Sequence, residues 1–134
     1  LAISLHGATD AVRERIMPVN RKYPLAELLD ACAYFSSRKK QHITFEYILI
    51  RDFNDSLRDA DAVARLLRGH PAKVNLIPTN PDPVLGERMV PPAPEVVEAF
   101  HRRLLERNFT STVRRQRGEQ VAPVVPGRAP IFAA

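Results

Sequence analysis

The chain of 134 residues has a single cysteine, Cys32, and no long hydrophobic run. One cysteine excludes an internal disulfide and any multi-cysteine metal site built from this chain alone, and it fits a reducing cytoplasm. No apolar run approaches the roughly 20 residues that span a bilayer, so we expect no membrane partner. We also expect no signal peptide, because the chain starts inside the apolar run 1–5 with no basic segment before it. We therefore expect a longer protein whose N-terminal half precedes residue 1.

The net charge of +5 is concentrated at the C-terminal end of the chain. Residues 1–100 hold 13 Lys and Arg against 13 Asp and Glu, whereas residues 101–134 hold seven Arg against two Glu. Clustered arginine favours a phosphate-rich partner, because each guanidinium can grip phosphate oxygens in a fork. A solvated basic tail explains the same pattern equally well.

Apolar, β-branched runs alternate with helical patterns along most of the chain. Helical spacing of apolar residues, together with capping residues such as Thr9 and Ser56, predicts four helices between four strands. The strands are expected at 1–6, 42–50, 73–78 and 110–114, and the helices at 9–16, 25–35, 56–69 and 95–107. Residues 19–23 and 79–94 are expected to be loops, the second dense in proline.

This order predicts an α/β fold with parallel strands and outer helices. Four strands are too few to close a barrel, so a half barrel or an incomplete open sheet is expected over residues 1–118. Residues 119–134 contain prolines and glycine without periodicity, and we expect a disordered tail there.

Ligands of parallel α/β folds bind at the carboxyl ends of the strands, where this sequence places polar residues. His6 ends the first strand, and Asn80 follows the third strand, although Asn80 before Pro81 also suits a simple turn. Glu46 shares one strand face with Thr44 and Ile48, where it could bind a ligand or form an ion pair.

Three arginines and the single cysteine are further candidates for a functional role. Arg114, Arg115 and Arg117 at the last strand repel one another unless a phosphate or an acid lies nearby, which favours a weak RNA-binding role. Cys32 lies on the apolar face of its helix and is expected to be a buried structural thiol. The residues alone therefore indicate part of a parallel α/β enzyme that acts on a phosphorylated or nucleic-acid substrate.

Several sequence motifs resemble those of the RlmN/Cfr family of radical-SAM RNA adenine methyltransferases, in order and in approximate spacing. They cover about residues 1–119. The motifs are Leu1 to His6 with Asp10, Arg13 and Met17 to Asn20; Phe45 to Ile50 with Asn54-Asp55; Val74 to Asn80; and Thr112 to Arg115 with Arg117-Gly118.

The resemblance implies a partial (β/α) barrel of the radical-SAM type that holds S-adenosylmethionine (SAM) and a [4Fe–4S] cluster. Such enzymes methylate an adenine of large-subunit rRNA at C2, or at C8 in Cfr-type members, and RlmN-type members also act on tRNA. We favour the RlmN type. Carried over from the family, the residues that contact SAM are Ser4, Leu5, His6 and Asn80.

The chain departs from the family pattern in two respects. The CxxxCxxC motif that binds the cluster is expected upstream of residue 1, so no metal ligand is expected here. Val125 stands where the family has its methyl-carrying cysteine, and valine has no nucleophilic atom. We therefore expect a chain that is inactive alone. The alternatives are a catalytically dead paralogue that still binds SAM or RNA, and an unrelated (β/α)-barrel enzyme that acts on a phosphorylated substrate.

Overall fold

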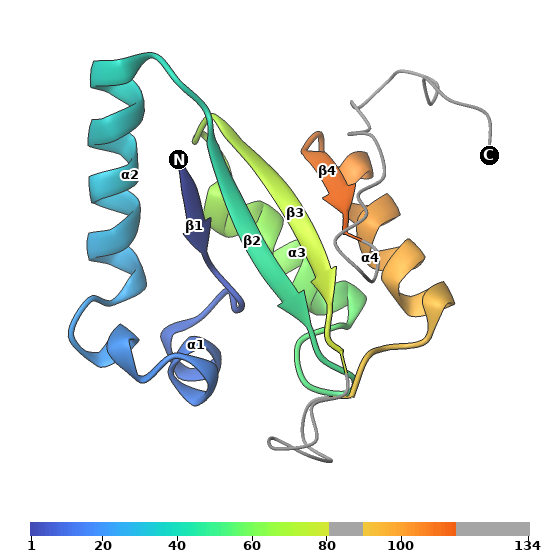
Figure 1. The fold of residues 1–134 in the computed structure, drawn as a ribbon. Coiled ribbons are helices and arrows are strands. Elements are labelled where there is room, and N and C mark those ends of the chain that lie inside the picture. Colours follow the sequence, from blue (N-terminus) through green and yellow to red (C-terminus); the bar gives the residue numbers. More distant parts are fainter. Residues whose placement is uncertain (81–89, 115–134) are drawn as a thin grey trace.

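The alternation of strands and helices that the sequence predicts is present in the computed structural model, which describes residues 1–80 and 90–114. Four parallel strands lie side by side in the order β1-β2-β3-β4, so each new strand is added to the same growing edge (Figure 1). The strands are β1 (Ala2–Ser4), β2 (Ile43–Leu49), β3 (Ala72–Pro78) and β4 (Thr110–Val113). The predicted strands were each right to within a few residues.

The two faces of the sheet differ sharply in character. In β2, Phe45 and Tyr47 are at most 1% exposed, whereas the alternate residues Thr44, Glu46 and Ile48 are only half-buried. Parallel register carries this alternation to the neighbouring strands, because Phe45 is paired with Val74 and Glu46 with Asn75. One face is therefore apolar and the other polar, as the sequence predicts for Glu46.

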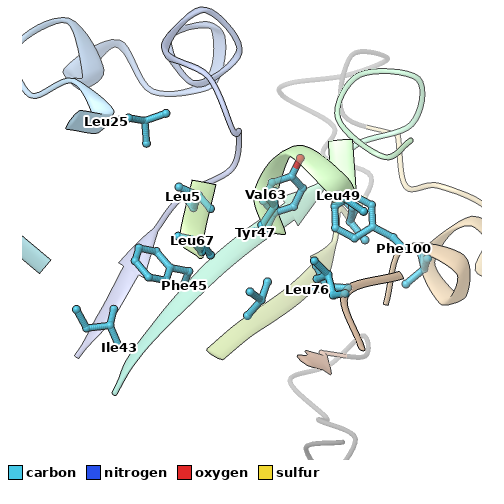
Figure 2. Close-up of a cluster of buried hydrophobic side chains, with 14 of the residues drawn as sticks. Leu5, Leu25, Ile43, Phe45, Tyr47, Leu49, Val63, Leu67, Leu76 and Phe100 are labelled. Atoms are coloured by element: carbon cyan, nitrogen blue, oxygen red, sulfur yellow. The ribbon is translucent and has the colours of Figure 1, made fainter. Parts of the chain in front are cut away.

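The apolar face and the helices that pack on it form the hydrophobic core. Figure 2 shows Tyr47 and Phe100 close together in this core, with ring centroids 5.2 Å apart. The helices are α1 (Asp10–Ile16), α2 (Leu25–Lys39), α3 (Leu57–Leu67) and α4 (Pro94–Glu106), with a short 3-10 helix η1 (Pro18–Arg21). Among the described residues, Figure 1 shows α3 behind β2 and β3 and α4 beside β4.

Local capping chemistry explains where two of these helices begin. The Thr9 hydroxyl accepts a hydrogen bond from the Val12 N–H, and Ser56 and Asp59 form a reciprocal capping box at the start of α3. One prediction was wrong. Residues 19–23 were expected to be a loop, but proline at the first position starts η1 over part of them.

These observations confirm an α/β fold in which parallel strands carry outer helices. Within residues 1–80 and 90–114 the sheet does not close, so the architecture is a partial (β/α) barrel. No helix in this part of the chain is long and apolar enough to cross a membrane. The predicted disordered tail, 119–134, lies outside the described residues.

Candidate functional site at the carboxyl edge of the sheet

Ser4, Leu5 and His6 lie at the carboxyl end of β1, at the edge of the sheet. His6 has a φ of 59°, a left-handed conformation that turns the chain sharply out of the strand. Gly7 follows because a Cβ there would lie 2.8 Å from the Val12 side chain. The turn is therefore held in a conformation that costs free energy, as happens at ligand sites when the surrounding structure fixes it.

The imidazole of His6 is held in one protonation state. Its Nδ1 accepts a hydrogen bond from the backbone N–H of Ile48, 3.0 Å away, so the ring proton of the neutral form lies on Nε2. Burial, together with the positive charge of Arg13, lowers the pKa of His6 from 6.5 to about 4. At neutral pH His6 is therefore an uncharged side chain that offers one N–H donor at Nε2.

A buried arginine holds the two residues before His6. Arg13 is 4% exposed, and its guanidinium donates to the carbonyl oxygens of Ser4 at 3.0 Å and Leu5 at 3.1 Å. A third bond goes to Oδ1 of Asn20 at 2.6 Å. The rigid fork of arginine suits such a task, because several donors act in one plane. We name this set of bonds the Arg13 clasp.

The Arg13 clasp is anchored in turn by Asp10 and Asn20. The Asp10 carboxylate accepts from Nδ2 of Asn20 at 3.0 Å and from the backbone N–H of Leu25 at 2.8 Å. These two hydrogen bonds lower the pKa of Asp10 below its usual value. The start of α1, η1 and the start of α2 are thereby tied to the turn that follows β1, as their positions near that strand end indicate (Figure 1).

A second clasp, formed by Asn54, holds His6 from the opposite side. Asn54 is fully buried, and its Nδ2 donates to the carbonyl oxygens of His6 at 3.0 Å and Ile48 at 2.7 Å. Its Oδ1 accepts from the backbone N–H of Ile50 at 2.8 Å. The Tyr47 hydroxyl donates to the Asn54 carbonyl oxygen at 2.8 Å and completes the Asn54 clasp.

Asn80 lies at the same edge, on the far side of β2 from His6. Thr79 is buried, and its backbone N–H donates to the Leu49 carbonyl oxygen at 3.1 Å, which continues the pairing of β3 with β2. Asn80 itself is exposed. Neighbouring strands are about 4.8 Å apart, so β1 and β3 are separated by about 10 Å at this edge. A molecule of nucleoside size can therefore reach His6 and Asn80 together.

The polar face of the sheet carries a charged pair just below this edge. The Glu46 carboxylate and the Arg114 guanidinium are 3.6 Å apart, and their side chains are 29% and 35% exposed. The ion-pair role considered for Glu46 is therefore confirmed. Arg114 is the one member of the predicted arginine group that the structure describes, since Arg115 and Arg117 lie outside residues 1–80 and 90–114, as does Val125.

The predicted SAM residues differ in what they can offer a ligand. The Leu5 side chain is fully buried in the core, so any ligand contact from Leu5 must come from its backbone. Ser4 is paired in register with Glu46 and lies on the polar face. Cys32 is 3% exposed in the core, and burial raises the pKa of its thiol, as expected for a structural cysteine. In the part of the chain that the structure describes, no three His, Cys, Asp or Glu residues are grouped to hold a metal ion.

Sequence reasoning assigned no role to the residues that form the two clasps. Arg13, Asn20 and Asn54 were only members of longer motifs, because a buried hydrogen bond between distant residues leaves no periodic signal. A sign in the sequence was available for a different residue, Asn75, whose amide interrupts the apolar residues 74–78 of β3.

Comparison with known proteins gives consistent results. No model of a protein family matches the sequence. The dual-specificity RNA methyltransferase RlmN of Anaeromyxobacter dehalogenans is 53% identical over 122 residues, which are 91% of this chain and 32% of that protein. RlmN of Geobacter sulfurreducens is 46% identical over 91% of this chain and 33% of its own length. This chain thus spans about a third of the length of the curated relatives that it matches.

Solved structures show the same relationship. The crystal structure of a radical SAM methyltransferase from Sphaerobacter thermophilus matches with a TM-score of 0.84 and 39% identity, covering 90% of this chain and 37% of that one. A domain of the pyruvate-formate lyase-activating enzyme from Bacteroides vulgatus matches with a TM-score of 0.65 at 18% identity, over 84% of this chain and 65% of that one. The second match concerns the fold alone.

Proposed function

We propose that this chain, which belongs to the RlmN/Cfr family of radical-SAM methyltransferases, is the SAM-binding C-terminal part of an enzyme that methylates adenine in RNA. The observation that carries the proposal is the pair of clasps around Ser4, Leu5 and His6. Arg13 fixes the first two carbonyl oxygens and Asn54 fixes the third. Two independent clasps on one strained turn indicate a binding edge fixed before the ligand arrives.

The proposed SAM contacts follow from what this edge presents. Neutral His6 donates through Nε2, Ser4 presents a hydroxyl on the polar face, and exposed Asn80 presents an amide across β2. Leu5 contributes through its backbone. Hydroxyl, amide and imidazole N–H groups suit the ribose hydroxyls and ring nitrogens of an adenosine group. SAM itself supplies the methyl group, and these residues orient it.

The [4Fe–4S] cluster does not fit the residues of this chain. Such a cluster needs several cysteine thiolates, and the one cysteine here is buried in the core with a raised thiol pKa. We propose that the cluster ligands, a CxxxCxxC motif, lie in the part of the protein upstream of residue 1.

The proposed substrate is an adenine in large-subunit rRNA, methylated at C2, with tRNA as a second substrate and the cytoplasm as the compartment. Its support is that the relatives are dual-specificity RNA methyltransferases, together with the cationic C-terminal end of this chain. Arg114, Arg115 and Arg117 are the proposed contacts to RNA phosphates.

The family resemblance also supports a second candidate function. It puts Val125 at the place of the methyl-carrying cysteine, and valine has no nucleophilic atom, so a protein of this sequence could bind SAM and RNA without methyl transfer. The third alternative, an unrelated barrel enzyme for phosphorylated substrates, is at odds with 53% identity to RlmN over 91% of the chain.

The two candidates are separated by an assay on the complete protein that contains this chain. After anaerobic reconstitution of the cluster, we would measure SAM binding by equilibrium dialysis and methyl transfer from labelled SAM to unmodified large-subunit rRNA. Val125→Cys is the informative variant, and Val121→Cys, four residues away in the same segment, is the matched control.

The expected result is SAM binding without methyl transfer in the natural sequence, with methyl-adenosine formation gained by Val125→Cys and not by Val121→Cys. Methyl transfer by the natural sequence would exclude the dead paralogue and would mean that another cysteine carries the methyl group. Absence of SAM binding would overturn the proposed function as a whole.

A further inference from the structure

A row of polar side chains crosses the polar face of the sheet one level below the clasped edge. Register places Ser4 of β1 beside Glu46 of β2, Glu46 beside Asn75 of β3, and Asn75 beside Thr112 of β4. All four side chains therefore lie on one face, at one height, across all four strands. We name these four residues, with Arg114, the polar row.

Asn75 is the member of the polar row whose hydrogen bonding needs an explanation. The residue is only 6% exposed, yet its Oδ1 has no hydrogen-bond partner in the part of the chain that the structure describes. A buried acceptor without a donor costs about 1–3 kcal/mol. A native fold can keep such an unpaired acceptor where the group has a function, for example where a bound ligand supplies the missing donor.

The neighbours of Asn75 offer complementary chemistry. Glu46 presents a second acceptor beside it, and Arg114 presents donors 3.6 Å from Glu46. Both charged side chains are about one-third exposed, so their ion pair is open to a molecule that enters from the polar face. The row thus pairs two acceptors with a cationic donor within the width of three strands, about 10 Å.

We propose that Glu46, Asn75 and Arg114 of the polar row bind an adenine ring by its hydrogen-bonding edge, in a subsite beside the Ser4–His6 and Asn80 contacts. The exocyclic amino group of adenine has two N–H donors, which match Asn75 Oδ1 and the Glu46 carboxylate. The adjacent ring nitrogen is an acceptor, which matches one N–H of Arg114; the guanidinium has five N–H donors, so others stay available for a phosphate. Asparagine amides read adenine in this donor–acceptor manner in other nucleic-acid complexes.

This inference rests on the proposed function, which supplies two sources of adenine. One is the adenosine group of SAM, and the other is the target base of the RNA, which must leave its stack to react. Both present the same amino group and ring nitrogen, so the subsite chemistry is shared. Occupancy by saturating SAM distinguishes the two sources.

The test compares adenosine with purine riboside, which is adenosine without the amino group. Both would be titrated into the complete protein by calorimetry, with and without saturating SAM, for the natural sequence and for Asn75→Leu. Leucine has a similar size and removes the acceptor. Thr44→Val is the matched control, because Thr44 lies on the same face of β2 one level farther from the edge.

The natural protein is expected to bind adenosine about tenfold more tightly than purine riboside, a preference that Asn75→Leu abolishes and Thr44→Val retains. The preference is a ratio measured on one sample, so a partly unfolded variant does not distort it. If saturating SAM removes adenosine binding, the row holds the adenine of SAM; if binding survives, it holds the RNA base. No preference in the natural protein, or an unchanged preference in Asn75→Leu, would overturn the inference.

Direct binding of labelled SAM, measured on the same samples, keeps the two proposals apart. SAM binding without an adenosine preference would refute the polar-row subsite and leave the proposed function intact. A protein that binds no SAM would refute the proposed function, whatever the nucleoside ratio shows.

Discussion

Replacement of Arg13 by methionine is the most demanding test of how the site is held. Methionine keeps the length of the side chain and removes every donor. Three acceptors then lose their partners, namely the carbonyl oxygens of Ser4 and Leu5 and Oδ1 of Asn20. A buried hydrogen bond to a charged group contributes about 1.5–3 kcal/mol, and the removal of one partner from a buried network costs about 3–5 kcal/mol in all.

We therefore expect Arg13→Met to lower the free energy of unfolding by about 3–5 kcal/mol, a large share of the roughly 5–15 kcal/mol of an ordinary domain. Arg13→Lys should cost about half as much, because one ammonium cannot reach three acceptors in a plane. Urea unfolding followed by circular dichroism measures both. Arg102→Met is the matched control: Arg102 is 65% exposed and, within the described residues, pairs with the exposed Glu98, so a change under about 0.5 kcal/mol is expected.

A second measurement separates the Arg13 clasp from general destabilisation. Arg13 contributes to the low pKa of His6, which is about 4. In folded Arg13→Met the pKa of His6 should rise, because a nearby positive charge is gone, and NMR titration of the imidazole reports it. The reasoning is refuted if Arg13→Met unfolds within about 1 kcal/mol of the natural protein. An unchanged His6 pKa in the folded variant would equally contradict the proposed arrangement.

Three further predictions concern the same edge and its support. The pKa of His6 is lower in the folded chain than the usual 6.5, so the free energy of unfolding should fall as pH drops from about 6.5 to about 4. Urea unfolding at several pH values should show that this loss is smaller by about 1–2 kcal/mol in His6→Asn, and an equal loss in both proteins would contradict it. Asn54→Ala should lower the free energy of unfolding by about 2–4 kcal/mol, since it leaves a buried N–H and two carbonyls unpaired, whereas Asn80→Ala, at an exposed position, should change it by less than about 0.5 kcal/mol; similar values for both would rule out the Asn54 clasp. Ser56→Ala should cost about 1 kcal/mol in thermal or urea unfolding through loss of the capping box, and no loss would show that the box is not stabilising.

The parts of the fold that sequence predicted well are those governed by local periodicity. Strand β2 was predictable because apolar side chains occupy every second position and therefore lie on one face of the strand. The turn at Ser56 was visible because capping needs residue types three apart. The 3-10 helix η1 shows the limit of this approach: a stretch bracketed by two prolines was expected to be a loop, but Pro18 at the first position starts a short helix there.

The site was predicted less completely, because its geometry depends on contacts between distant positions. Asn54 reaches His6 across 48 residues of sequence, and no local pattern encodes such a bond. The position of His6 and Asn80 at strand ends was visible, since parallel folds bind ligands there. The sequence does not reveal which groups hold the edge in place and which are free to contact a ligand. Only the three-dimensional structure separates the two.

Spare hydrogen-bonding capacity is what separates these two kinds of residue. Arg13 uses Nε and both terminal nitrogens on protein acceptors, and Asn54 uses both amide functions on backbone groups. Neither has reason to touch a ligand, so their substitution should act on stability and on the shape of the edge together. Asn75 is in the opposite state, because its buried acceptor is unpaired within the described part of the chain and its replacement by leucine removes a cost. A residue whose loss weakens ligand binding while it leaves stability unchanged or raises it must be positioned for the ligand. By this criterion we expect Asn75→Leu to place Asn75 in the binding surface and Arg13→Met to place Arg13 in its support.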